Sequence, residues 1–137
     1  MSQYKPVINS YLRCIENKDF IYSFYDRFLA SGTEIKNKFT HVDFDKQTKL
    51  LRHGLMSVIT YLDQKSLAGK YMFEKLRETH GTLGMNILPE HYEIWKKSMI
   101  ETIRTVDPEF SDSLEQQWNH VLDVAIRLIQ HEDEALN

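Results

Sequence analysis

Apolar residues recur at every third or fourth position in six segments of the chain, and no segment of convincing length alternates strictly between apolar and polar residues. A period of three to four residues places apolar side chains on one face of an α-helix, whereas a half-buried strand needs a period of two. The last segment is typical, with Leu114, Trp118, Val121 and Ala125 on one face. The pattern therefore predicts an all-α protein.

Proline, glycine and capping residues divide these segments into helices. The first helix has Pro6 in its first turn, the second is capped by Asp19 and ended by Gly32, and a short third starts at Thr33. Asp43 is expected to cap a long fourth helix that runs through Leu62, and a fifth helix covers about 66–80. Pro89 opens the next helix, which ends before a turn at Asp107-Pro108, and Ser111 or Asp112 caps the last.

Length and composition fit one domain over residues 1–137. The formal net charge of -3, with the two signs interspersed, gives no basic surface for nucleic acid and no reason to expect an anionic membrane. Cys14 is the only cysteine, so a disulfide or thiolate metal cluster within one chain is excluded and a reducing compartment is expected. The chain begins without an apolar signal segment and has no run of about 20 apolar residues, so we expect a cytoplasmic protein.

His80 is the residue with the most informative position. It follows Phe73 and Leu76 on the apolar face of the expected helix over 66–80. A titratable imidazole that faces a core needs a partner. Taken in isolation, His80 is more simply explained as a core or helix-capping histidine that has a hydrogen-bond partner. A metal-ligating histidine is the alternative.

Three further motifs favour the interpretation of His80 as a metal ligand. They are FYDRF at 24–28, followed by Lys38-Phe39; HVDFDKQTKLL at 41–51; and PEHY at 89–92, just beyond His80. Together with His80 they resemble a bacterial globin over about residues 7–132. FYDRF and PEHY are similar to the globin domain of flavohaemoglobins, and the 41–51 segment is similar to single-domain and sensor-linked bacterial globins. The resemblance implies a globin fold, with about seven helices packed around a haem b pocket.

The resemblance assigns roles to residues of this chain. His80 would be the proximal ligand of the haem iron, and Phe39 would pack on the porphyrin at the corner between two helices. Tyr25 and Gln47 would hydrogen-bond the gas ligand on the distal side, and Leu51, one turn after Gln47 on the same helix face, would line the pocket.

Each distal assignment has a simpler alternative. Tyr25 shares a face with Ile21 and Phe28, so it can be a core tyrosine bonded to a backbone carbonyl, and Tyr22 is a competing candidate three residues earlier. Gln47 lies one turn inside its helix and can be solvated there.

The resemblance also implies a second layer on the proximal side. In flavohaemoglobins, a tyrosine of the PEHY-like stretch and a late glutamate support the proximal histidine, which points here to Tyr92 and Glu132. The loop from His80 to Pro89 is longer here than in that family, which leaves the alignment of Tyr92 with His80 open. For Glu132, a surface position near the C-terminus is the simpler alternative.

The remaining histidines carry less weight. His53 should point away from the Gln47 face, and His41 lies in the corner loop. The other three, His91, His120 and His131, show no zinc-ligand spacing and are interpreted as surface or boundary residues.

The function that follows from the resemblance is reversible binding of oxygen, or of nitric oxide or another diatomic gas, at haem iron. Storage, sensing and nitric oxide dioxygenation all remain open. An enzymatic role would need a separate reductase, and a sensing role would need a signalling partner. The alternative from another functional class is a haemless globin-fold interaction or sensor module, and a helical bundle unrelated to globins is the third possibility.

Overall fold

The computed structural model describes residues 3–40, 42–64 and 89–135, with side chains over 3–40, 42–63 and 90–127. These residues form six α-helices, one 3-10 turn and no strand: α1 (Lys5–Glu16), α2 (Phe20–Ala30), α3 (Thr33–Lys38), α4 (Phe44–Gln64), η2 (Pro89–His91), α6 (Tyr92–Val106) and α7 (Asp112–Ala135). The all-α prediction is confirmed. The expected helix over 66–80, which includes His80, lies outside the described residues.

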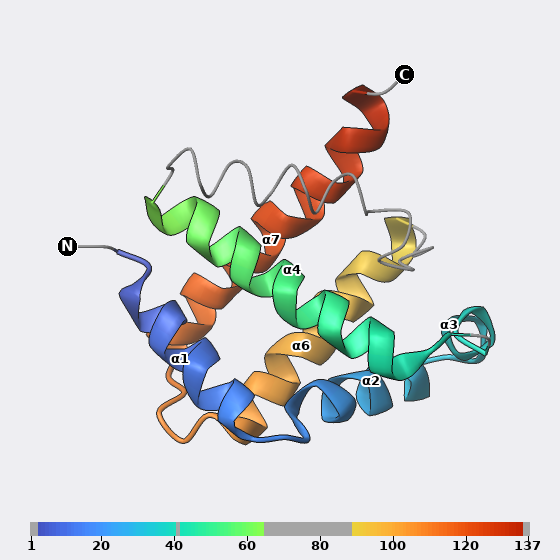
Figure 1. Ribbon diagram of the computed structural model, residues 1–137, viewed down its shortest axis with the longest axis horizontal. Helices are drawn as coiled ribbons and strands as arrows, with labels where there is room; N and C mark the ends of the chain where they lie inside the picture. Colours follow the sequence, from blue (N-terminus) through green and yellow to red (C-terminus); the bar gives the residue numbers. More distant parts are fainter. Residues whose placement is uncertain (1–2, 41, 65–88, 136–137) are drawn as a thin grey trace.

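The helices cross one another in layers and do not run side by side as a parallel bundle. Figure 1 shows α4 passing in front of α6 and α7, with α1 near one end of α4 and α3 near the other. Helix α2 packs against α6, α6 packs against α7, and α4 contacts both α2 and α7. The buried aromatic residues gather where α2, α3 and α6 meet, and Trp118 of α7 is fully buried behind α1.

Local capping chemistry explains where two of the long helices begin. The Asp43 carboxylate accepts hydrogen bonds from the amides of Asp45, at 3.1 Å, and Lys46, at 3.3 Å, and so caps α4. At the start of α7, the Ser111 hydroxyl accepts a hydrogen bond from the Leu114 amide at 3.2 Å. Of the two candidates for this cap, Ser111 makes the bond.

Asp19 departs from the prediction. It occupies the position before α2, but its side chain makes no capping hydrogen bond. Its backbone is helical, with φ -92° and ψ 0°, whereas a capping side chain usually needs an extended backbone. The Asn17 side chain instead accepts a bond from the Asp19 amide at 2.9 Å.

The turn after α6 is held by a buried carboxylate. One oxygen of Asp107 accepts bonds from Arg13 Nε at 2.7 Å and the Glu109 amide at 2.9 Å; the other accepts from the Ser10 hydroxyl at 2.6 Å and Arg13 Nη2 at 3.0 Å. Trp118 Nε1 donates to Ser10 Oγ at 2.9 Å. We call Ser10, Arg13, Asp107 and Trp118 the Asp107 cluster. It joins α1 to α7 and to the end of α6.

The electrostatics of the Asp107 cluster favour an ionised carboxylate. Burial works to raise the pKa of Asp107, but the hydrogen bonds from Arg13, Ser10 and the Glu109 amide outweigh it and lower the pKa below its ordinary value. Asp107 is therefore charged at neutral pH.

None of the helices in the described ranges combines the length and the apolar character that a bilayer span requires.

Candidate functional site

The fold brings together Tyr25 of α2 and Gln47 of α4. Each residue is only 3% exposed, and their side chains are hydrogen-bonded to each other. Gln47 is thus not solvated, and Tyr25 is bonded to a side-chain amide. We call these two residues the Tyr25–Gln47 pair.

The phenol of Tyr25 stays protonated at neutral pH. Burial raises the pKa of Tyr25 far above its ordinary value, and the hydrogen bond with Gln47 offsets a smaller part of that increase. The Tyr25 hydroxyl therefore keeps its proton and can act as a hydrogen-bond donor.

Aromatic rings surround the pair. The ring centroid of Tyr25 lies 5.5 Å from that of Phe44 and 6.3 Å from that of Phe39, and Phe39 is also 5.8 Å from Phe28. Phe39 follows the last residue of α3 and is 4% exposed; Leu51, one turn beyond Gln47, is 3% exposed. The two polar side chains thus lie in an apolar setting, where each hydrogen bond is electrostatically stronger than in water.

The structure separates the two candidate tyrosines. Tyr22 is 44% exposed, and its hydroxyl donates to Asp45 at 2.8 Å on the protein surface. Tyr25, one helical turn later, points into the core. Burial of the Tyr25 ring, expected from the face that it shares with Ile21 and Phe28, is confirmed.

The predicted proximal side is described only in part. Tyr92, the first residue of α6, is buried at 7% exposure. His80, the predicted metal ligand, lies outside the described residues, as does the side chain of Glu132.

The structure corrects the interpretation of one histidine. His91, expected at the surface or boundary, is 6% exposed, because η2 places its ring against α3, where Nε2 lies 3.8 Å from the Glu34 carboxylate. His53 and His120 are exposed as expected, and the Tyr4 hydroxyl and His120 Nε2 are 3.2 Å apart. His41 and the side chain of His131 are outside the described part of the chain.

One buried polar atom near the pair had no sequence signal. Trp95 of α6 is 2% exposed, and its ring lies edge-on to Phe24 at 6.0 Å. Within the described residues, Trp95 Nε1 has no hydrogen-bond partner. An unpaired buried donor costs about 1–3 kcal/mol, which marks this part of the core as a place where a further group would be stabilising.

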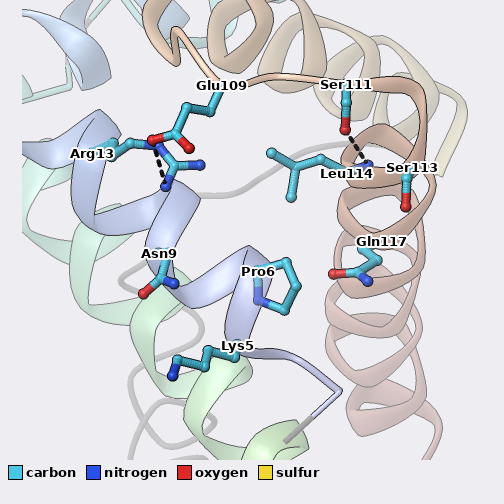
Figure 2. Close-up of a pocket in the computed structure, with 9 residues that line it drawn as sticks. All are labelled: Lys5, Pro6, Asn9, Arg13, Glu109, Ser111, Ser113, Leu114 and Gln117. Carbon is cyan, nitrogen blue, oxygen red and sulfur yellow. Dashed lines mark hydrogen bonds and ion pairs between the residues drawn. The ribbon is translucent and has the colours of Figure 1, made fainter.

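A separate surface hollow of about 510 Å³ lies between α1 and the beginning of α7 (Figure 2). Its lining includes Lys5, Asn9, Arg13 and Glu109, and it contains none of the predicted site residues. Arg13 connects this hollow to the Asp107 cluster, so we assign it to the scaffold and not to the candidate site.

Comparison with known proteins agrees with the arrangement of the helices. The family model described as Globin matches residues 22–129. A flavohemoprotein of Vibrio cholerae is 28% identical over 98 residues, which is 69% of this chain and 24% of that protein, so the chain spans about a quarter of its length.

A solved structure from Pseudomonas aeruginosa, described as structurally highly homologous to a human haemoglobin, superposes with a TM-score of 0.79 at 28% identity. The superposition covers 94% of this chain and 96% of that one. Since the family model spans most of the sequence and the helices follow the same path, the chain belongs to the globin family.

Proposed function

We propose that this globin binds haem b, with His80 as the iron ligand, and reversibly binds oxygen or another diatomic gas. The observation that carries the proposal is the Tyr25–Gln47 pair, a buried and hydrogen-bonded polar pair among the aromatic rings of α2, α3 and α4. Membership of the globin family supports the proposal independently.

The described residues fit a haem. A flat and mostly apolar macrocycle needs apolar walls, which Phe39 and Leu51 supply, with Tyr92 on the α6 side. When bound, haem supplies an iron centre that takes up diatomic gases reversibly.

Tyr25 and Gln47 would act as hydrogen-bond donors to the gas. Because both side chains are buried, water does not compete with them, and their positions are fixed before the gas arrives. A gas that gains negative charge on binding, as dioxygen does, is stabilised by these donors more than carbon monoxide, which gains little. The high pKa of Tyr25 keeps its proton in place for this purpose.

The proposal leaves storage, sensing and nitric oxide dioxygenation as three uses of one site. Dioxygenation consumes electrons, which would come from a reductase outside these 137 residues. Sensing would require a signalling partner. All three uses are compatible with a single domain over residues 1–137 that works in the cytoplasm.

An absorption spectrum of the purified protein supplied with haem tests the proposal. We expect an intense Soret band in the wild type, and loss or strong alteration of that band in His80→Ala. His53→Ala is the matched control, because His53 is exposed on α4 and should leave the spectrum unchanged. A wild type that shows only aromatic absorption would favour the haemless interaction module, and a normal spectrum in His80→Ala would refute the ligand assignment.

A further inference from the structure

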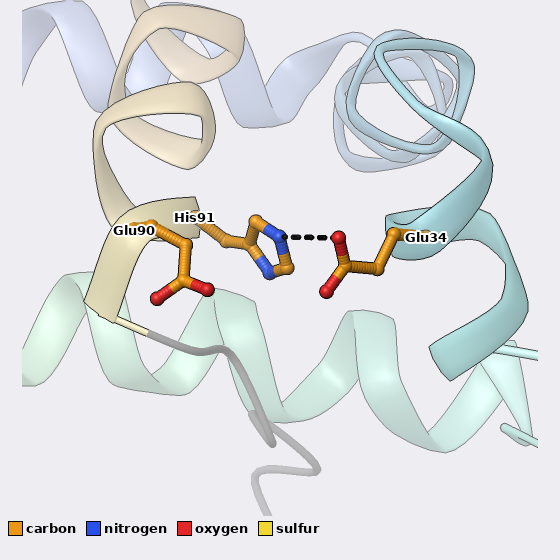
Figure 3. Close-up of side chains that lie close together, drawn as sticks. All are labelled: Glu34, Glu90 and His91. Atoms are coloured by element: carbon orange, nitrogen blue, oxygen red, sulfur yellow. Dashed lines mark ion pairs between the residues drawn. The ribbon is translucent and has the colours of Figure 1, made fainter.

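Two glutamates and a histidine meet between α3 and η2, away from the Tyr25–Gln47 pair. Glu34 belongs to α3, and Glu90 and His91 belong to η2. One ligand atom of each residue lies within 4.8 Å of the other two. Figure 3 shows the imidazole of His91 between the two glutamates, with its ring directed at the Glu34 carboxylate.

The imidazole of His91 is mostly buried, and among the described residues it makes no hydrogen bond. Only 8% of the His91 side chain is exposed, and its polar contact among the described residues is the Glu34 oxygen 3.8 Å from Nε2. That distance is too long for a hydrogen bond. A buried ring that faces carboxylates and makes no hydrogen bond within the described residues is available to donate a nitrogen lone pair to a metal ion.

We propose that Glu34, Glu90 and His91 bind a divalent transition-metal ion, with Zn²⁺ as the best match. One imidazole nitrogen and two carboxylates supply three ligands of a tetrahedral site, and a water molecule completes it. The imidazole favours zinc and its neighbours in the transition series over Mg²⁺ and Ca²⁺, which prefer all-oxygen sites.

The geometry needs only a small adjustment. Ligand atoms about 2.0–2.2 Å from a tetrahedral zinc lie roughly 3.4 Å apart, so the glutamates must move inward by about an ångström. Both can do so, because Glu90 is exposed and the Glu34 side chain is 66% exposed. The buried ring of His91 would provide the fixed ligand.

A metal at this site would connect two elements that flank the candidate haem pocket. Helix α3 leads directly into Phe39, and His91 is followed directly by Tyr92. None of the three ligands has a role in the proposed haem site. Metal binding can therefore be tested on both haem-free and haem-loaded protein, and it stands or falls separately from the proposed function.

Zinc titration of the chelator-treated full-length chain, in competition with a chromophoric chelator, tests the site. We expect Glu34→Gln and Glu90→Gln each to weaken zinc binding by at least about tenfold. Both residues are exposed, so the variants should fold normally. Glu93→Gln is the matched control, because it removes the same charge from a side chain that is 80% exposed and outside the cluster.

X-ray absorption at the zinc edge gives a second readout. We expect one nitrogen ligand and otherwise oxygen ligands in the wild type. Zinc affinities in Glu34→Gln and Glu90→Gln that equal the wild-type value would overturn the proposal. A spectrum dominated by several imidazoles would do the same, since it would place the zinc at other histidines.

Discussion

Two buried polar clusters in the described part of the chain, the Asp107 cluster and the Tyr25–Gln47 pair, have opposite character. In the Asp107 cluster, both carboxylate oxygens accept two hydrogen bonds each, from Arg13, Ser10 and a backbone amide. In the Tyr25–Gln47 pair, two neutral side chains are hydrogen-bonded to each other among aromatic rings. The first cluster therefore holds a charged group whose two oxygens are fully hydrogen-bonded by the chain, whereas the second contains only neutral groups.

Because of this difference, we expect the Asp107 cluster to contribute to stability and the Tyr25–Gln47 pair to contribute to gas binding. A buried charge that loses its partners becomes strongly unfavourable, so the Asp107 cluster should contribute to the free energy of unfolding. Neutral hydroxyl and amide groups cost less to leave partly paired, so a chain can keep them buried for a ligand that arrives later. Variants in the first cluster should therefore change folding, and variants in the second should change gas binding.

The largest expected effect is that of Asp107→Ala. Removing the carboxylate leaves Ser10 and the Arg13 guanidinium without their shared acceptor, and the free energy of unfolding should fall by about 3–5 kcal/mol. Urea denaturation followed by circular dichroism measures the loss. Glu109→Ala is the control: Glu109 pairs with Arg13 at 3.4 Å but is 69% exposed, so its removal should cost less than about 1 kcal/mol. Equal losses of stability in the two variants would mean that burial does not explain the contribution of the Asp107 carboxylate.

Tyr25→Phe should change stability little and oxygen release strongly, which is the reverse of what we expect for Asp107→Ala. The variant loses one neutral hydrogen bond, so its stability should fall by only about 1 kcal/mol. Oxygen release from the haem-loaded protein should accelerate about ten- to a hundredfold, since the hydroxyl is worth about 1.5–3 kcal/mol to a charged ligand, while carbon monoxide release changes much less. Stopped-flow displacement of oxygen by carbon monoxide measures the rate. Unchanged oxygen release would make Tyr25 a core residue.

Gln47→Leu should act in the same direction with a smaller effect, roughly fivefold for a loss of about 1 kcal/mol. Because the two side chains are bonded to each other, their contributions should not be independent. The double variant should therefore release oxygen more slowly than the product of the two single effects predicts. A strictly multiplicative result would show that the two donors act separately.

Features that depend on nearby residues were predictable from the sequence. The caps at Asp43 and Ser111 involve amides within three residues, and both are observed. The burial of the Tyr25 ring was predicted from the apolar face that it shares with Ile21 and Phe28, and it is observed. The preference for Tyr25 over Tyr22 came from the resemblance, in which an aspartate and an arginine follow the pocket tyrosine, and the exposure of Tyr22 agrees with that preference. Asp19 shows the limit of even local rules, because its own backbone conformation prevents the cap.

Features that join distant segments were not predictable. Nothing near Asp107 in the sequence shows that Ser10 and Arg13 of α1 would reach it, so the pair Asp107-Pro108 indicated only a turn. His91 was interpreted as a surface or boundary residue because its contact, Glu34, lies on another helix. The hydrogen bond between Tyr25 and Gln47 likewise depends on the packing of α2 against α4, which a single sequence does not specify.

The pH dependence of the free energy of unfolding tests the stabilising role of the Asp107 cluster. Because the pKa of Asp107 is lower in the folded protein than its ordinary value, the folded state binds fewer protons near pH 4 than the unfolded state. The stabilisation is present above the unfolded pKa and is lost as the pH falls toward the folded pKa. The free energy of unfolding should decrease more steeply between about pH 5 and pH 3 in the wild type than in Asp107→Asn. Parallel pH profiles for the two proteins would contradict this assignment.

The smallest expected effect is that of Tyr22→Phe, which removes a hydroxyl from the same helix as Tyr25. The Tyr22 hydroxyl donates to Asp45 at the surface, where water can replace the bond, so the variant should fold like the wild type. Its oxygen release should also be unchanged, because the ring lies on the solvent side of α2. The experiment uses the same stopped-flow measurement as Tyr25→Phe and compares two tyrosines that differ by one helical turn. If Tyr22→Phe accelerated oxygen release as much as Tyr25→Phe, burial would not explain the difference between the two tyrosines, and the distal assignment of Tyr25 would be wrong.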